Sequence, residues 1–510
     1  MLVSIILATC AQSLNEIEST LIASVDKSTY ENGAYSAART LADNRSADAM
    51  RLRIKLFDTK YTTYRGVYLR DWFYTGYTKS NTRQEGDLML VAAASKKQSA
   101  WHRILLLRGI ELSKVQVSGD LLLNKNFLKD DDICRAWQQC AGVLLKESRI
   151  DFSDVKASRG QSAKDKLLDL FNKAGAPYYG YAYLDQLSPA QLQQLVRTAT
   201  EAKDPSDRAI AIRVLLQQDP SNTNILPIAL STFNDQDSGP RTAVLDSMIE
   251  NEIFSAVPTL ISLLKAEVAA FPDLPNRYIP DIGNALRKLT GITFGDSPEM
   301  WRDWWQKGGK EWLATVKKGS VKTEAASQKD AHTVSKFFGI PVNSNNVAIL
   351  VDGSGSMSSS YLRGETCAAA AAIEVDNFLK SQPKKVMFNV AAIEPTIEFG
   401  FKKMMANSSK NRAKALKFLK SRSYRSTSAL FDALEAAALN PGIDTVLLVS
   451  DGGSSAGKHQ YPGHTLEAYK RLYLRTGLRV HSVLVTDSNK HAGFLSNLSA
   501  ISGGRMVQPK

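Results

Sequence analysis

Three oxygen-bearing side chains alternate with small residues in the stretch VDGSGSM, which holds Asp352, Ser354 and Ser356. The spacing Asp-x-Ser-x-Ser can present three oxygens to one point, and the intervening glycines relax the backbone. Oxygen donors without histidine or thiolate favour Mg²⁺ or Mn²⁺ over zinc or copper. The stretch therefore predicts a site for a hard divalent cation. Taken alone, it is equally typical of a Gly/Ser loop with no ligand.

Two later segments carry oxygens that fit the same site. Asp451 ends the apolar run TVLLVSD, and the hydroxyls of Thr427 and Ser428 lie in YRSTSALFDAL, which opens a helical pattern. In parallel sheets, ligands bind in the crevice outside the carboxyl ends of the strands. We therefore expect three loops from this edge to converge on one cation.

The elements that must position these residues alternate along residues 345–510. The runs NVAILVD, KKVMFNVAAI, DTVLLVSD, LRVHSVLVT and GRMVQ predict strands, with helical patterns between them. Near-continuous apolar strands separated by helices favour a parallel sheet covered on both faces. An α/β doubly wound domain is expected here.

The chain before this domain has helical periodicity. Residues 14–160 predict a helical domain, and residues 161–318 predict short amphipathic helices, several opened by proline, that stack into a solenoid. Residues 319–344 predict a lysine-rich linker and lead-in. Residues 1–13 hold a short apolar run that fits a signal peptide or a buried N-terminal helix.

These motifs together resemble a known family. VDGSGSM, SDG and FLSNLSAISGGRMV resemble a von Willebrand factor type A (VWA) domain with a metal-ion-dependent adhesion site. VPTLISLLK and NALRKLTG resemble HEAT repeats, and with LTGITFGDSPEMWRDWW the chain resembles bacterial HEAT–VWA proteins. The predicted fold class is multidomain: an α-helical HEAT-like solenoid, then an α/β doubly wound, Rossmann-like VWA domain with a mainly parallel sheet.

The resemblance implies roles for the site residues. Ser354 and Ser356 would bind Mg²⁺ (or Mn²⁺) directly, and Asp352 and Asp451 would bind it directly or through water. The fifth ligand of the family is a threonine. Here the spacing from ALFDAL favours Ser428 and leaves Thr427 open.

The same resemblance implies the function. In this family a carboxylate from a protein partner completes the metal's coordination, which predicts a non-enzymatic interaction or adhesion protein with the helical repeats as a second binding surface. The alternative is a structural scaffold that acts mainly through the repeats, with a secondary or purely stabilising metal site. A serine hydrolase is disfavoured, because Ser455 in GSSAG lacks the immediate helix that such a motif needs.

Composition bounds the remaining expectations. The 510-residue chain has a net charge of +13, from 64 basic and 51 acidic residues spread without blocks, which favours a solvated basic surface over specific nucleic-acid binding. No segment is long enough to predict a transmembrane helix. LATC ending at Cys10 weakly resembles a lipobox, so an exported protein (periplasmic, cell-envelope or secreted) is expected, with a lipid anchor and a cytoplasmic location both left open.

Overall fold

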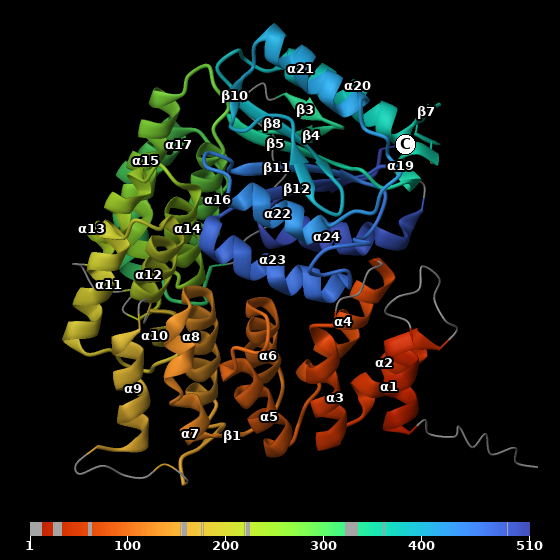
Figure 1. The fold of residues 1–510 in the computed structure, drawn as a ribbon. Helices are drawn as coiled ribbons and strands as arrows, with labels where there is room; N and C mark the ends of the chain where they lie inside the picture. The colour runs from red at the N-terminus through yellow and green to blue at the C-terminus, as the bar shows by residue number, and fades with distance from the viewer. Residues whose placement is uncertain are drawn as a thin grey trace, which may run out of the picture. The chain divides into compact units, whose positions relative to one another are not determined.

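Helices account for the chain up to about residue 315, and an α/β sheet follows, as Figure 1 shows. The computed structural model describes residues 13–23, 33–59, 64–153, 155, 161–174, 176, 178–218, 220, 225–321, 335–359, 361–362, 364–486 and 488–509. The predicted signal segment with Cys10 lies outside these residues except for Ser13, as do residues 322–334 of the predicted linker. Within the described ranges, no helix has the length and apolar character needed to cross a bilayer.

The chain divides into two units, Met1–Asp185 and Gln186–Lys510. The first is almost entirely helical and adds one pair of two-residue parallel strands, β1 (Val117–Ser118) and β2 (Ile150–Asp151). Its helices are α1 (Leu14–Ala23), α2 (Ala34–Asp43), α3 (Ala47–Phe57), α4 (Tyr64–Thr78), α5 (Arg83–Ala94), α6 (Ala100–Leu112), α7 (Gly119–Leu122), η1 (Lys125–Lys129), α8 (Asp131–Lys146), α9 (Ala163–Lys173) and α10 (Tyr178–Tyr181). The helical prediction for this part of the chain is confirmed, whereas the predicted domain bounds stay predictions.

The second unit begins with a further series of helices. They are α11 (Pro189–Glu201), α12 (Pro205–Gln218), α13 (Ile225–Ser231), η2 (Thr232–Asn234), α14 (Ser238–Glu250), η3 (Phe254–Ala256), α15 (Val257–Ala270), α16 (Tyr278–Thr290), α17 (Pro298–Trp304), the π-helical turn η4 (Trp305–Gly309) and α18 (Lys310–Thr315). The Ser188 hydroxyl caps α11, with Pro189 in its first turn, and Gly291 ends α16 with φ = 79°. The serine cap and proline fix where α11 begins, and the glycine fixes where α16 ends.

The α/β part of this unit contains a mainly parallel sheet. The strand order is β10-β8-β5-β11-β12-β13, and β9 and β10 pair antiparallel with β8. The strands are β5 (Asn346–Asp352), β8 (Met387–Ile393), β9 (Ile397–Phe399), β10 (Met405–Ala406), β11 (Thr445–Ser450), β12 (Arg479–Leu484) and β13 (Met506–Val507). All five predicted strands are present. Strand β5 has β8 on one side and β11 on the other, so the topology reverses at its carboxyl end, where a ligand site is expected.

Helices cover both faces of this sheet, as Figure 1 shows. One face packs against α20 (Cys367–Ser381) and α21 (Ser409–Lys420), and the other against α22 (Leu430–Ala438), α23 (Pro462–Thr476) and α24 (Ala492–Ile501). Successive residues of β5 alternate between the two cores: Val347, Ile349 and Val351 face α20, and Ala348 and Leu350 face α22. This burial of both faces explains why the strands are continuously apolar, and it confirms the predicted α/β fold class.

The lead-in to the sheet is part of this core. Residues 336–341 form a small hairpin, β3 (Lys336–Phe337) and β4 (Ile340–Pro341). Phe337 is fully buried, and its ring lies 5.5 Å from that of Phe378 on α20. The last residues of the predicted linker segment therefore pack as structure rather than as a spacer.

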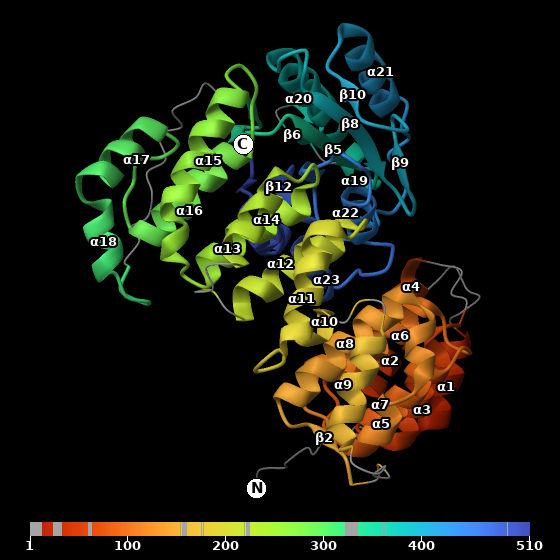
Figure 2. The ribbon, with the colours of Figure 1, turned by 90° about the vertical axis from the view of Figure 1, so that its left-hand side faces the viewer.

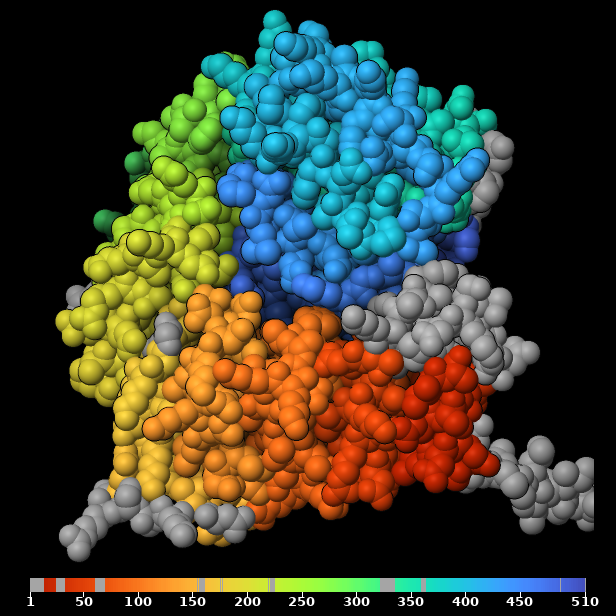
Figure 3. All heavy atoms as spheres, in the orientation of Figure 1, coloured from red at the N-terminus to blue at the C-terminus, as the bar shows by residue number. Residues whose placement is uncertain are grey.

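The helices of the second unit pack against the amino end of its sheet. Helices α12 and α14 contact α23; Figure 2 shows these helices beside one another, and Figure 3 shows the atoms of the two parts in contact. Arg277, 2% exposed, donates to the carbonyls of Asp444 (2.6 Å) and Gly477 (2.8 Å), which precede β11 and β12. Arg213 donates to the Leu474 carbonyl at 3.1 Å. We call this set of contacts the helix–sheet joint.

Candidate metal centre

Asp352 ends β5 with its carboxylate buried at the carboxyl edge of the sheet, where it is 2% exposed. Its Oδ1 accepts the backbone N–H of Ser354 at 2.8 Å, and its Oδ2 accepts the hydroxyl of Ser450 at 2.6 Å. Burial raises the pKa of Asp352 to about 6; the hydrogen bonds from Ser450 and Ser354 oppose this rise, and the charge of Asp451 adds to it. The carboxylate is thus oriented but lacks charge compensation.

The loop after β5 brings two hydroxyls together. The Oγ atoms of Ser354 and Ser356 lie 3.0 Å apart. Gly353 makes this path possible, because a Cβ there would lie 2.8 Å from Cγ of Glu394 and 2.9 Å from the Ile393 carbonyl oxygen. The predicted alternation therefore has a structural basis: the glycine passes against β8, and the two serines share one side of the loop.

A second loop, residues 424–428, runs alongside the first. Gly355 donates its N–H to the Ser426 carbonyl at 3.1 Å, and Ser354 and Ser426 form an isolated parallel bridge. The Ser358 hydroxyl donates to the Tyr424 carbonyl at 3.2 Å. These bonds fix the two loops to each other without using the oxygens of Asp352.

Ser428 and Thr427 differ in their surroundings. Ser428 is 1% exposed, whereas Thr427 is half-buried. The Ser428 carbonyl accepts the N–H groups of Ser455 and Ala456, each at 2.9 Å, and its own N–H donates to Oγ of Ser455 at 3.0 Å. The second loop is therefore tied to the third through Ser428. This burial favours Ser428 as the fifth ligand, an assignment that stays a prediction.

Asp451 directly follows β11 in the third loop and is half-buried. It lies close enough to Asp352 to raise the pKa of that carboxyl, and its charge opposes the lowering of the His491 pKa that burial and Lys490 cause. In the described part of the chain, no lysine or arginine forms an ion pair with Asp352 or Asp451. The carboxylates of Asp352 and Asp451 therefore lie near each other at the carboxyl edge of the sheet, with no ion pair to a basic side chain among the described residues.

The residues at this edge fit a hard divalent cation. They provide two carboxylates and closely spaced serine hydroxyls on loops that hydrogen bonds hold together, and the buried Asp352 has no positive partner among the described residues. Mg²⁺ prefers such oxygen ligands and usually retains water. The structure places Asp352, Ser354 and Ser356 in one loop and ties the loops of Ser428 and Asp451 to it.

Ser450 is the supporting residue that the sequence did not reveal. It is the last residue of β11, so its position in the pattern is that of a buried strand residue. Its hydroxyl nevertheless fixes Oδ2 of Asp352 and accepts the N–H of Gly452 at 3.1 Å. A hydroxyl directly before the aspartate of SDG was the available signal.

The rival GSSAG motif has a structural use in the same loop. Ser455 accepts the Ser428 N–H through its hydroxyl, and among the described residues no histidine hydrogen bonds to it. No helix follows at once, because α23 begins only at Pro462. The strand–turn–helix geometry of a nucleophile elbow is therefore not formed.

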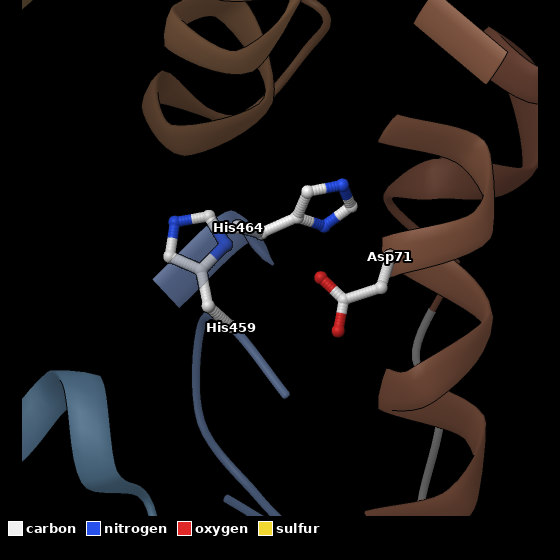
Figure 4. A group of neighbouring side chains, drawn as sticks. All are labelled: Asp71, His459 and His464. Carbon is white, nitrogen blue, oxygen red and sulfur yellow. The ribbon is translucent and has the colours of Figure 1, made fainter. Parts of the chain in front are cut away.

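Figure 4 draws two histidines beyond the metal loops: His459 lies in the third loop and His464 in the first turn of α23. The rings of His459 and His464 have centroids 6.3 Å apart, and the His459 ring packs edge-on against Phe431 at 5.0 Å. Asp71, which Figure 4 also labels, belongs to the first unit.

A family model described as "von Willebrand factor type A domain" matches residues 345–507. Residues 345–507 form a VWA domain. The match covers the sheet, its helices and all three loops, and the helices before it are consistent with helical repeats.

Solved structures with some similarity include three of interest. A von Willebrand factor type A protein from Catenulispora acidiphila is 18% identical over 34% of this chain and 40% of its own, with a TM-score of 0.27. The PilB minor pilin from Streptococcus sanguinis is 12% identical over 33% and 58%, with a TM-score of 0.26. The RO (RSR) protein of Deinococcus radiodurans is 15% identical over 96% and 99%, with a TM-score of 0.20. The chain spans less than half of the first of these, and comparison with curated proteins gave no match.

Proposed function

We propose that this protein is a non-enzymatic interaction protein that uses Mg²⁺ in its VWA domain to capture a carboxylate of a protein partner. Asp352, Ser354, Ser356, Asp451 and either Ser428 or Thr427 would hold the ion. The observation that carries the proposal is the buried Asp352 carboxylate, which has no cationic partner among the described residues and is next to the paired hydroxyls of Ser354 and Ser356.

The bound ion would supply a localised positive charge at the loop edge, where an incoming Asp or Glu gains strong electrostatic attraction. The protein's own groups prepare this edge. Ser450 orients Asp352, and Ser428 ties the second loop to the third, so that the oxygens are held before a partner arrives. Such preorganisation lowers the entropic cost of binding.

An alternative is a scaffold in which the helical repeats bind the partner and the metal site only stabilises the fold. Export from the cytoplasm stays part of the proposal on the strength of the N-terminal apolar run alone.

A pull-down from native cell extract tests capture. Full-length protein with Mg²⁺ should retain a partner that is lost on adding EDTA and lost with Asp352→Ala. Asp376→Ala is the matched control, because Asp376 pairs with Lys380 on the surface of α20, away from the three loops. It should retain the partner.

If EDTA and Asp352→Ala both leave retention of the partner unchanged, metal-dependent capture is contradicted and the scaffold alternative is supported. Circular dichroism of each variant checks that the fold is intact before the binding results are compared.

A further inference from the structure

A small cavity of about 210 Å³ lies at the amino end of the sheet, where α16 meets β12. We call it the arginine pocket and define it by six of its lining residues: Arg277, Asp281, Asn284, Arg479, His481 and Arg505. Asp281 and Asn284 come from α16, and Arg479 and His481 from β12. Pockets for drug-sized molecules have volumes of about 300–1,000 Å³, so this one suits a smaller ligand.

The charge of the arginine pocket is positive. Three guanidinium groups line the pocket together with the carboxylate of Asp281. The carboxylate of Asp444 accepts from the lining residues Ser344 and Thr445, each at 2.6 Å, so the net charge is about +1 (three minus two). Asp281 is already engaged, at 2.7 Å from Nη2 of Arg479 and 3.5 Å from Nε of Arg277. Burial, together with the charges of Arg479, Arg505 and Arg277, lowers the pKa of His481 to about 3.

Three further groups of the pocket, on His481, Asn284 and Arg479, can donate to a ligand. Nδ1 of His481 accepts the backbone N–H of Arg505 at 3.0 Å, which places the hydrogen of the neutral ring on Nε2. Oδ1 of Asn284 accepts from Arg287 at 2.8 Å, so that its amide NH₂ is left to donate. Arg479 uses Nε on the Ser502 carbonyl and Nη2 on Asp281, and its Nη1 has no partner among the described residues.

We propose that the arginine pocket binds a small oxyanion, either free phosphate or the phosphate group of a phosphomonoester. The excess of positive charge favours an anion, and a tetrahedral anion can accept from guanidinium, imidazole and amide donors that approach from different directions. The anion would contact Asn284 on the helical side and Arg479 on the sheet side. It would therefore strengthen the helix–sheet joint from the end of the sheet opposite the metal loops.

Calorimetric titration of the full-length chain tests this site. Sodium phosphate is titrated into Mg²⁺-free protein at constant ionic strength, and sodium chloride gives the blank. We expect saturable one-site binding. Arg505→Gln, which removes an exposed guanidinium, and Asn284→Asp, which adds a carboxylate of the same shape, should each weaken it about tenfold or more. Arg302→Gln, at a half-exposed arginine on α17, is the matched control and should bind as the wild type does.

A second arm uses glycerol 3-phosphate. Binding equal to that of phosphate identifies a phosphomonoester site, and binding of phosphate alone identifies a free-ion site. Absence of saturable phosphate binding by the wild-type chain would overturn the proposal. So would unchanged binding by both pocket variants, or an equal loss in Arg302→Gln, with circular dichroism confirming that each variant is folded.

Discussion

The two ends of the sheet in the VWA domain are built from opposite chemistry. At the carboxyl end, Asp352 and Asp451 lie in loops of glycine and serine with no ion pair to a basic side chain among the described residues. At the amino end, the buried Arg277 and the half-buried Arg213 come from the helical part of the unit and donate to backbone carbonyls of the VWA domain. The carboxylates at one end have no ion pair to a basic side chain among the described residues, and the arginines at the other end hydrogen bond to the backbone of the sheet domain.

This difference teaches that the VWA domain is not an independent module in this chain. The carbonyls of Asp444 and Gly477 precede strands β11 and β12, and both accept from Arg277, outside the family match. The Asp444 carbonyl also accepts the N–H of Arg479 at 2.9 Å. A fragment that begins at residue 331 would leave these carbonyls without that donor. Experiments on the metal site therefore need the full-length chain.

The largest expected loss of stability comes from removing the Arg277 contacts at the amino end of the sheet. Arg277→Met removes a donor to two buried carbonyls and the buried ion pair with Asp281, and it should lower the free energy of unfolding by about 3–5 kcal/mol. Urea denaturation followed by circular dichroism measures it. Asp352→Asn, at the carboxyl end, should cost no stability at neutral pH without metal. If Arg277→Met lowered the free energy of unfolding as little as Asp352→Asn does, the amino end would contribute no more to stability than the carboxyl end, which contradicts the account.

The pH dependence of stability should differ between Asp352 at the carboxyl end and His481 at the amino end. The pKa of Asp352 is about 6 in the folded chain, above its unfolded value of about 3.9, so the folded state holds the proton more tightly. Without metal, stability should therefore fall by roughly 3 kcal/mol as the pH rises from about 4 to about 6. Asp352→Asn should abolish this component, which is visible as a difference between two series of urea curves in EDTA.

His481 at the amino end should act with the opposite sign. Its pKa of about 3 in the folded chain lies below its unfolded value of about 6.5, so its contribution to stability is complete above about 6.5 and is lost as the pH falls toward 3. His481→Gln should remove that acid-side loss. Parallel pH profiles for wild type and both variants would contradict these assignments.

Close packing at the joint predicts a smaller effect. A Cβ on Gly239 would lie 2.6 Å from the Arg475 carbonyl oxygen, so Gly239→Ala should destabilise the chain by about 1–3 kcal/mol. Gly493→Ala is the matched control, since no atom lies within 4 Å of its added Cβ, and it should be neutral or slightly stabilising. Differential scanning calorimetry compares the two, and equal melting temperatures would argue against tight packing of α14 on α23.

Substitution of the fifth metal ligand is expected to have the smallest effect, and it decides between Ser428 and Thr427. Ser428→Ala should weaken Mg²⁺ binding about tenfold, because it removes the hydroxyl proposed as the fifth ligand and leaves the backbone bonds between the loops in place. Thr427→Ala should leave the affinity almost unchanged. The reverse pattern would assign the ligand to Thr427.

The sequence predicted the carboxyl end of the sheet better than the amino end. The five strands and the alternation in DGSGSM are local patterns, and the structure confirms the strands and brings the three loops together. Helix α21 escaped prediction because its lysine-rich sequence obscures its apolar positions, and the hairpin before β5 has strands too short for periodicity.

Arg277 shows why the joint could not be predicted. In the sequence PNRYIP it has the pattern of a solvated arginine beside prolines. Its burial depends on carbonyls of residues far along the chain, at Asp444 and Gly477, which only the tertiary fold brings near. The residues predicted for the metal site could be found because each lies in a recognisable motif after a strand or before a helix. Arg277 and its two carbonyl partners lie in no such motif, so their contact could not be predicted from the sequence.

Titration of Mg²⁺ into the full-length chain, stripped with EDTA, tests the central claim most directly. Isothermal calorimetry should show saturable one-site binding for the wild type and none for the Asp352→Ala/Asp451→Ala variant, which removes both carboxylates from the edge. Circular dichroism would confirm that the variant is folded. Equal heats in the two proteins, or none in the wild type, would contradict a metal centre at the carboxyl end of this sheet.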